Sequence, residues 1–241
     1  MLTIENLREF TKQYQTNEHN VVREYMQHLC LSNLYKYKEA GNLLFKGGTA
    51  LRVIYHSPRF SEDLDFTGRF YHYRDVEELL LKALVEVERT GVIMKLKEAK
   101  STTGGYLGMI EYSLYDNTGT ICFEISLRKP KKDRSEVVTI PNDFTISYSI
   151  VQLPVRNLVS EKIQALIARA KPRDYYDLYF MLRHNLLGKL INKSKFAVIL
   201  NRLEQEKIDF RKELSHLLPI SHHIILKNFP SVLRNEINSY L

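Results

Sequence analysis

The spacing of apolar and polar residues predicts that the first two thirds of the chain mixes helices with strands. Apolar side chains recur every three or four residues, as on one face of a helix, in two long segments, 20–40 and 75–89. Shorter segments with apolar runs or alternation predict strands: 43–46, 63–66, 92–97, 106–115, 120–128 and 147–153. A short helix is expected at 49–55, and the turn residues Asp116 to Gly119 predict a hairpin. These elements together predict an α+β lobe with a mixed sheet.

After Pro154 the pattern becomes helical almost to the end of the chain. The segments with helical spacing are 157–170, 174–184, 194–206 and 222–239. This change predicts two lobes, a mixed-sheet lobe over 1–153 and a helical C-terminal lobe over 154–241.

Composition indicates an ordinary globular protein. Of the 241 residues, 44% are hydrophobic and 26% are charged, and no apolar run approaches the about eighteen residues that a membrane span needs. The N-terminal segment lacks the basic start and apolar stretch of a secretory signal, and two cysteines make no disulfide framework. We therefore expect a cytoplasmic protein that does not associate with a membrane.

Two short motifs carry the candidate chemistry. Gly47, Gly48 and Thr49 lie between a predicted strand and a predicted helix, where backbone N–H groups can bind phosphate. Asp63 and Asp65 lie two apart on the next predicted strand, so their side chains share a face and can hold a divalent cation. A phosphate-binding turn beside paired carboxylates indicates metal-assisted phosphoryl or nucleotidyl transfer. Mg²⁺ is the expected metal because it prefers oxygen ligands, with Mn²⁺ as the alternative.

Each half of this pattern is weak by itself. Glycine pairs usually make turns, and most Asp-x-Asp pairs are solvated loop acids. Here, however, Asp63-Leu64-Asp65-Phe66 alternates acid with apolar residues, which favours a half-buried strand.

One further residue is a candidate on the same grounds. Ser61 precedes Asp63 by two residues. Its hydroxyl would bind phosphate or orient Asp63. A phosphoryl group added to this hydroxyl would repel the triphosphate of an incoming nucleotide. Alternatively, Ser61 is a turn residue that ends a loop.

The spacing of the motifs resembles the DNA polymerase β-type nucleotidyltransferase superfamily. Its pattern is Gly-(Gly/Ser), a short spacer, and Asp-apolar-(Asp/Glu)-apolar. Gly48-Thr49 and the 13 residues Ala50 to Glu62 precede Asp63 here, with threonine as a departure from the usual glycine or serine. Two later segments narrow the resemblance to one family within this superfamily. They are 160–166, Ser-Glu-Lys-Ile-Gln-Ala-Leu, and 171–178, Lys-Pro-Arg-Asp-Tyr-Tyr-Asp-Leu. With them the chain is similar to the AbiEii/AbiGii toxin family, the toxin halves of abortive-infection toxin–antitoxin pairs.

The resemblance implies transfer of a nucleotide from an NTP, in relatives onto the 3′ end of tRNA, and an antitoxin encoded nearby. It makes 1–153 the catalytic lobe, and it implies a third carboxylate from a neighbouring strand. Glu124, the only acid in the apolar stretch 121–127, is the candidate for that carboxylate; otherwise it is a solvent-facing acid.

The resemblance also implies a triphosphate-binding role for Lys162, which would otherwise be read as a solvated helix lysine. Asp174 is either a helix N-cap or a nucleotide-binding residue, whereas Asp177 is favoured as a catalytic residue. Arg169 and Arg173 would either bind phosphate or pair with these aspartates.

The charge of the chain supports an anionic partner. Net charge is +7 with pI ≈ 9.2, and basic residues gather in two places. One cluster is Arg128, Lys129, Lys131, Lys132 and Arg134; the other is Arg156, Lys162, Arg169, Lys171 and Arg173. Such runs are most often solvated faces, but beside a phosphate-transfer site they favour RNA, with tRNA as the expected acceptor.

The sequence therefore predicts a Mg²⁺-dependent nucleotidyltransferase toxin that modifies RNA and blocks translation. Two alternatives stay open. The first is a nucleotidyltransferase that acts on a small molecule or a protein, and the second is a catalytically silent nucleotide- or RNA-binding module.

Overall fold

A computed structural model describes residues 1–70, 72–127, 135–188 and 193–241. These residues form two compact units, the first made of 1–56 and 60–153 and the second of 57–59 and 154–241. The short segment 57–59 therefore belongs to the second unit, although the chain on either side of it belongs to the first.

The first unit is built on a mixed sheet. In the part of the chain that the structure describes, seven strands form it in the order β3-β4-β5-β2-β1-β7-β6. The strands are β1 Leu43–Lys46, β2 Leu64–Gly68, β3 Ile93–Thr102, β4 Gly105–Leu114, β5 Asn117–Leu127, β6 Glu136–Ile140 and β7 Tyr148–Gln152. β2 runs parallel to β5 and β1 parallel to β7, while the other neighbours are antiparallel. The predicted α+β class with a mixed sheet is confirmed.

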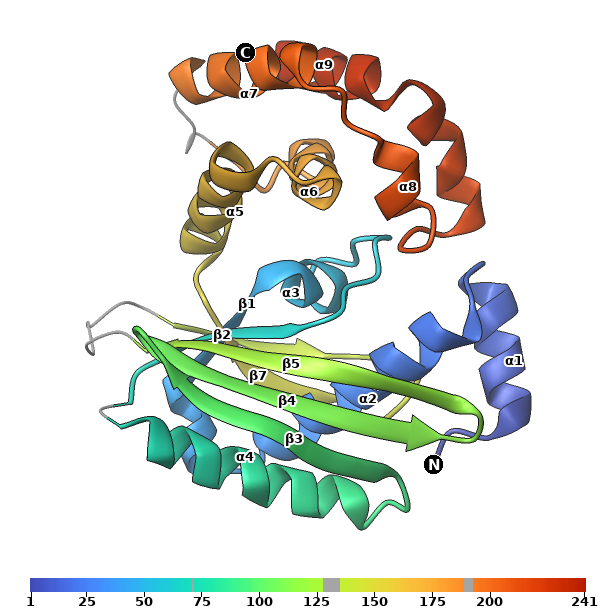
Figure 1. The fold of residues 1–241 in the computed structure, drawn as a ribbon, viewed down its shortest axis with the longest axis vertical. Coiled ribbons are helices and arrows are strands. Elements are labelled where there is room, and N and C mark those ends of the chain that lie inside the picture. The colour runs from blue at the N-terminus through green and yellow to red at the C-terminus, as the bar shows by residue number, and fades with distance from the viewer. Residues whose placement is uncertain (71, 128–134, 189–192) are drawn as a thin grey trace. The chain divides into compact units, whose positions relative to one another are not determined.

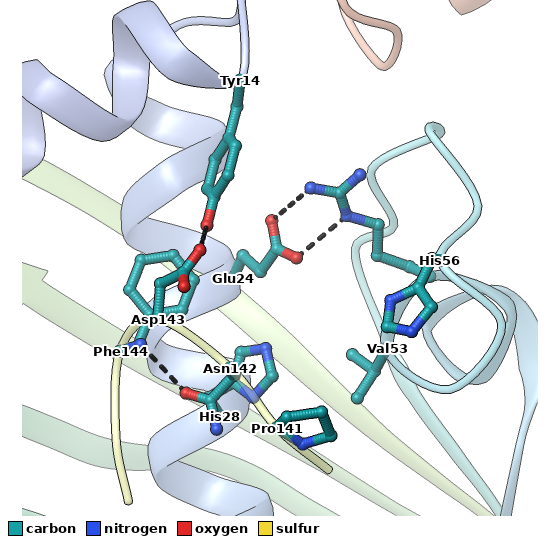
Figure 2. Close-up of a pocket in the computed structure, with 10 residues that line it drawn as sticks. Tyr14, Glu24, His28, Val53, His56, Pro141, Asn142, Asp143 and Phe144 are labelled. Carbon is teal, nitrogen blue, oxygen red and sulfur yellow. Dashed lines mark hydrogen bonds and ion pairs between the residues drawn. The ribbon is translucent and has the colours of Figure 1, made fainter. Parts of the chain in front are cut away.

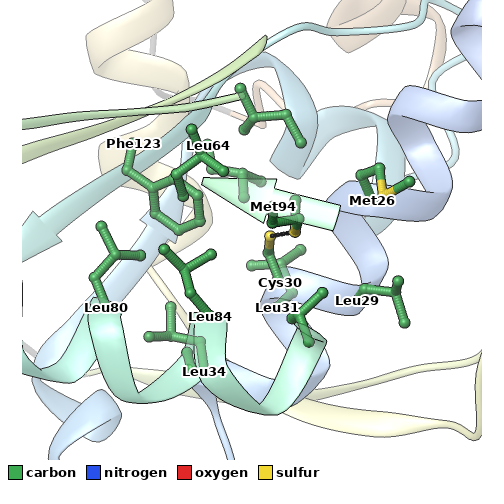
Figure 3. Packing of buried hydrophobic residues seen from close by; sticks show 14 of the residues in the cluster. Met26, Leu29, Cys30, Leu31, Leu34, Leu64, Leu80, Leu84, Met94 and Phe123 are labelled. Carbon is green, nitrogen blue, oxygen red and sulfur yellow. Dashed lines mark hydrogen bonds between the residues drawn. The ribbon is translucent and has the colours of Figure 1, made fainter. Parts of the chain in front are cut away.

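Helices cover both faces of this sheet. They are α1 Ile4–Gln13, α2 Glu18–Leu34, the 3₁₀ helix η1 Lys38–Asn42, α3 Gly47–Val53 and α4 Tyr73–Glu88. Figure 1 shows α2 and α4 along one face and α3 on the other. Figure 3 shows side chains of α2 and α4, such as Leu31 and Leu84, packed towards Phe123 of the sheet. This burial of apolar surface is the main force that holds the helices in place.

An aromatic row underlies the centre of the sheet. Phe45, Phe66 and Phe123 come from the adjacent strands β1, β2 and β5, and neighbouring ring centroids lie 5.4 and 6.0 Å apart. Because strand side chains alternate between faces, this row turns the residues next to it in sequence, Asp65 and Glu124, to the opposite face.

The structure moves or adds some elements of this unit. β4 and β5 form the predicted hairpin, but Leu114 pairs with Asn117, so the turn is Tyr115-Asp116 rather than Asp116 to Gly119. Tyr115 takes the left-handed backbone conformation there, with φ 53°. Strand β6 and helix α1 were not predicted. β6 is short and is held by its pairing with β7, whereas α1 does carry a helical signal, with Ile4, Leu7 and Phe10 at helical spacing after the N-cap Thr3.

The second unit consists of helices that pack around a central helix, α6. Its elements are α5 Val155–Arg169, α6 Pro172–Arg183, α7 Lys193–Gln205, α8 Phe210–Leu214, the 3₁₀ helix η2 Ile220–Asn228 and α9 Phe229–Tyr240. α6 packs against α5, α8 and α9. The single helix predicted over 222–239 is wrong: it is divided into η2 and α9, and Pro230 lies in the first turn of α9, where its missing N–H costs nothing.

Within the ranges described above, no helix combines the length and the apolar character that crossing a membrane requires.

Candidate active site

The three acids predicted from the first motifs lie on neighbouring strands of the first unit. β2 begins at Leu64, directly after Asp63, and Asp65 is paired in register with Glu124 of β5. Residues paired across neighbouring strands project to the same face, so Asp65 and Glu124 share it. Asp63 and Glu124 both act on Cys122: burial first, and then these two carboxylates, raise the pKa of the thiol to about 11. The acids thus create one negatively charged face opposite the aromatic row.

Buried polar side chains hold the segment that leads into β2. Thr49, fully buried on α3, donates its hydroxyl to the backbone carbonyl of Asp63. The amide of Gln27 on α2 donates to the carbonyls of Ser61 and Glu62, at 3.0 and 3.1 Å. The hydroxyl of Thr49 therefore positions the carboxylate strand. Gln27 was missed, because a single glutamine in an amphipathic helix gives no sequence signal.

Gly47 is required by a close approach. α3 begins at Gly47, whose φ is +83°, and a Cβ built on it would lie 1.9 Å from Oδ2 of Asp65. Only glycine leaves room for that carboxylate at the turn. Gly48 follows it as a buried residue of α3. The predicted Gly-Gly turn and the predicted carboxylate strand are therefore brought together.

The chemistry of these residues fits a magnesium ion that is completed by substrate. Among the described residues, no three His, Cys, Asp or Glu side chains gather closely enough to hold a metal by themselves. Mg²⁺ is usually bound by one or two carboxylates, with phosphate oxygens and waters supplying the other ligands. Asp63 and Asp65 can provide that pair.

In the second unit, Asp177 of α6 forms the centre of a buried group of charges. Its carboxylate accepts two hydrogen bonds from Arg59, at 2.8 and 3.0 Å, and one from Nζ of Lys162 on α5, at 2.7 Å. Asp177 is 1% exposed and Arg59 is 3% exposed. Lys162 and Asp177 were predicted from the sequence as functional residues, whereas Arg59 was not. The only available signal was its place four residues before Asp63.

The partners of Asp177 decide its ionisation. Burial by itself would raise the pKa of this carboxyl group, but the charges and hydrogen bonds of Arg59 and Lys162 outweigh burial and lower its pKa. Asp177 is therefore an anion at neutral pH, held between two cations.

Two arginines of the second basic cluster pair with acids. Arg169 forms two hydrogen bonds of 2.8 Å with Asp174, and Arg173 lies 3.5 Å from Glu213. Asp174 also accepts the backbone N–H of Lys171, which is itself the N-cap of α6. The prediction that Asp174 is the N-cap is therefore wrong. Lys171 is the N-cap, and Asp174 is the third helical residue, where its side chain completes a capping box. Of the two readings offered for Arg169, the structure shows the pair with aspartate.

The basic cluster Arg128, Lys129, Lys131, Lys132 and Arg134 lies outside the described residues.

A cavity of about 200 Å³ lies in the first unit, and none of the predicted site residues lines it. Figure 2 shows Tyr14, Glu24 and His28 among its lining residues, together with the loop Pro141 to Phe144. Glu24 forms two hydrogen bonds with Arg52, at 2.9 and 3.0 Å. Ligand pockets are usually about 300–1,000 Å³, so this cavity is too small for a nucleoside triphosphate.

His28, at the wall of this cavity, should make the stability of the protein depend on pH. Burial, and then the charge of Arg52, lower the pKa of His28 to about 4, whereas an unfolded histidine titrates near about 6.5. As pH falls between these values the unfolded state takes up a proton first, so stability is lost. From pH 7.5 to 4.5 we expect a loss of about 2 to 3 kcal/mol from this group.

Urea denaturation of the wild type and His28→Gln at both pH values measures this effect. Glutamine keeps a hydrogen-bonding group for Tyr148, whose hydroxyl lies 2.8 Å from Nδ1 of His28, but it does not titrate. The same loss of stability in both proteins would contradict the assignment.

A mixed sheet that carries carboxylates on adjacent strands beside a Gly-Gly turn is the architecture of a nucleotidyltransferase, and comparisons with known proteins agree. A family model described as nucleotidyl transferase AbiEii toxin, type IV toxin–antitoxin system, matches residues 30–237. The chain belongs to this family, and the protein is a nucleotidyltransferase. Membership implies an antitoxin partner and a nucleotide substrate.

Solved structures share the fold. One is a protein from H. pylori whose assignment as a nucleotidyltransferase is itself provisional, with 22% identity, a TM-score of 0.63, and coverage of 92% of this chain and 94% of that chain. Another is JHP933 from Helicobacter pylori, with 21% identity, a TM-score of 0.61, and coverage of 92% of each chain. No curated protein matches the chain.

Proposed function

We propose that the protein transfers a nucleoside monophosphate from an NTP to an RNA acceptor, and that the acceptor is the 3′ end of tRNA. Modification of that end would block translation. A protein that acts on this substrate would work in the cytoplasm. The observation that carries the proposal is the shared face of Asp65 and Glu124, with Asp63 beside them and Gly47 in contact with Asp65.

The reaction requires a hydroxyl oxygen of the acceptor to attack the α-phosphorus while the bond to the leaving pyrophosphate breaks. Asp63 and Asp65 would hold Mg²⁺, which when bound neutralises charge on the phosphates. Glu124, an exposed carboxylate on the same face, is the candidate to accept the proton of the attacking hydroxyl. The backbone at Gly47 to Thr49 would bind phosphate of the NTP. Lys162 is the phosphate-binding candidate of the second unit.

RNA is favoured as the acceptor by charge. The protein carries +7, with five basic residues between Arg128 and Arg134. In the second basic cluster, Arg156 and Lys171 are exposed, whereas Arg169 and Arg173 have the acidic partners described above. An RNA acceptor would be held largely through phosphates.

Incubation with each of the four α-labelled NTPs, Mg²⁺ and purified tRNA tests the proposal. We expect label on tRNA from at least one NTP. The KM for tRNA should rise steeply with salt, with a log–log slope of about 0.7 to 0.9 for each phosphate contact. Label on protein or on a small metabolite would replace the RNA proposal with the other transferase hypothesis. Nucleotide binding without any transfer would indicate a silent binding module.

Reversal of charge at Lys131 and Lys132 should raise the KM for tRNA and leave the KM for the NTP nearly unchanged. The matched control reverses Lys97 and Lys100, two exposed lysines of β3 that pair with glutamates of the same sheet. An equal effect of both double reversals would show that overall charge, and not the 128–134 cluster, attracts the RNA.

A further inference from the structure

A groove of about 570 Å³ lies along β3, β4 and β5. Its lining comes from the end of β3, the turn into β4 and the last part of β5, and it includes Glu124 and Ser126. All of these residues belong to the first unit. Small-molecule sites usually have volumes of about 300–1,000 Å³, so the groove is large enough for a nucleoside.

The groove lies on the face of the sheet that carries the candidate carboxylates. Gly105 of β4 is paired with Ser126, and Glu124 lies two residues before Ser126, so both β5 side chains project to this face. Gly105 has no side chain, and a Cβ built on it would lie 2.1 Å from the carbonyl oxygen of Ile125. The bare backbone of β4 thus leaves space between Ser126 and Thr102, which is paired with Gly105 on the other side.

The lining of the groove favours a neutral ligand that carries hydroxyl groups. Thr102 and Thr103 are exposed and Ser126 is half-buried, so three hydroxyl groups that can donate and accept hydrogen bonds are within reach. Among the described residues that line the groove, Glu124 is the only charged one, and none is a lysine or an arginine. Side chains that bind phosphate strongly are cationic. The groove therefore suits the ribose and base of a nucleoside rather than its phosphates.

The order of the strands places the groove and the phosphate-binding turn on opposite sides of the acids. α3, which begins at Gly47, packs on β1 and β2, whereas the groove lies along β3 to β5. The strand order β4-β5-β2-β1 puts Glu124 and Asp65 between them. In phosphoryl transfer the attacking and leaving oxygens lie roughly in line, on opposite sides of the phosphorus. A triphosphate bound at the turn is therefore open to attack by a hydroxyl that comes from the groove.

We propose that the groove binds the terminal nucleoside of the RNA acceptor. Its 3′-hydroxyl faces Glu124, and its 2′-hydroxyl hydrogen-bonds to Ser126. The Cα atoms of Glu124 and Ser126 are about 7 Å apart along the strand, a distance that hydrogen bonds to adjacent hydroxyls of one ribose can bridge. The 3′-oxygen bonds to the α-phosphorus as the bond to pyrophosphate breaks, and Glu124 takes the proton. This inference rests on the proposed function, which supplies the RNA acceptor and the role of Glu124.

A cycle of changes in the protein and in the acceptor tests the contact with Ser126. Ser126→Ala removes the protein hydroxyl, and a tRNA whose last nucleoside is 2′-deoxy removes its partner but keeps the attacking group. Each change alone should lower kcat/KM for tRNA about tenfold, as expected for the loss of one hydrogen bond. Together they should also lower it only about tenfold, because both remove the same bond. If Ser126→Ala lowers kcat/KM by the same factor on both tRNAs, the contact does not exist and the inference fails.

A larger side chain at the same position tests whether the acceptor occupies the groove. Ser126→Leu should raise the KM for tRNA at least about tenfold, while the affinity for the NTP, measured without tRNA, stays within about threefold. Ser113→Leu is the matched control, because Ser113 is a half-buried serine of β4 on the same face of the sheet but outside the groove. It should leave both values unchanged. Unfolding temperatures of all variants are measured, and the cycle with Ser126→Ala decides the matter if Ser126→Leu does not fold.

The outcomes distinguish this inference from the proposed function. If the wild type labels no RNA with any NTP, the proposed function fails, and the inference fails with it. If tRNA is labelled but neither Ser126 variant changes its kinetics, the groove is not the acceptor site and only the inference fails. A lower affinity for the NTP in Ser126→Leu, with the KM for tRNA unchanged, would show that the groove holds the nucleoside of the NTP, which also overturns the inference.

Discussion

Asparagine at Asp63 or Asp65 is expected to lower nucleotidyl transfer at least about a thousandfold while the fold is retained. A metal ligand acts mostly in the transition state, so its loss lowers kcat, and a thousandfold corresponds to about 4 kcal/mol of activation free energy. The fold should persist because asparagine has the size of aspartate and the aromatic row on the opposite face is untouched.

The measurement is kcat for label transfer with Mg²⁺, together with thermal unfolding of each variant. Glu111→Gln is the matched control, because Glu111 is an exposed acid of β4 in the same sheet that pairs with Lys97. It should keep activity within about twofold. Turnover near that of the wild type in either asparagine variant would sink the metal assignment.

The second large effect is expected for Gly47→Ala, with a loss of activity of at least about a hundredfold. A Cβ at Gly47 would lie 1.9 Å from Oδ2 of Asp65, so the carboxylate, the turn or both must move. A displacement of about 1 Å at a reacting group can cost about a hundredfold in rate. The positive φ adds a backbone cost of about 1–2 kcal/mol to the folded state.

Gly91→Ala separates the collision from the backbone strain. Gly91 has φ +86°, close to the +83° of Gly47, but its Cβ would meet only Sδ of Met1 at 3.7 Å. Gly91→Ala should lose only the stability that the backbone strain costs and should keep activity. Gly47→Ala should lose at least as much stability in urea denaturation, because the collision adds to the strain, and it alone should lose activity. If Gly47→Ala keeps full activity, the contact with Asp65 has no part in catalysis.

Local patterns were enough to predict much of the fold and the first motifs. Alternation over Asp63 to Phe66 predicted which side chains enter the core, and Leu64 and Phe66 are fully buried while Asp65 is half-buried. Helical spacing placed α4, α5 and α6 to within a few residues, whereas the helix predicted over 20–40 ends at Leu34 and is followed by the 3₁₀ helix η1. Two errors, the hairpin turn at Tyr115 and the break before α9, lie where local backbone geometry decides the structure. Strand β6 was missed for another reason, because its pairing with β7 is a tertiary contact.

The sequence by itself determined the mixed-sheet lobe followed by helices, because these follow from periods of two and 3.6 residues. Its short motifs carried the resemblance to the family that the family model confirms, and they supplied the candidate acids. Only the tertiary structure decided which charges meet. Arg59 and Asp177 are 118 positions apart, and Gln27 reaches the carbonyl of Ser61 across 34. Gly47 and Asp65 meet only through the register of β1 with β2. Contacts between distant positions depend on chain packing, and a single sequence carries no local signal for them.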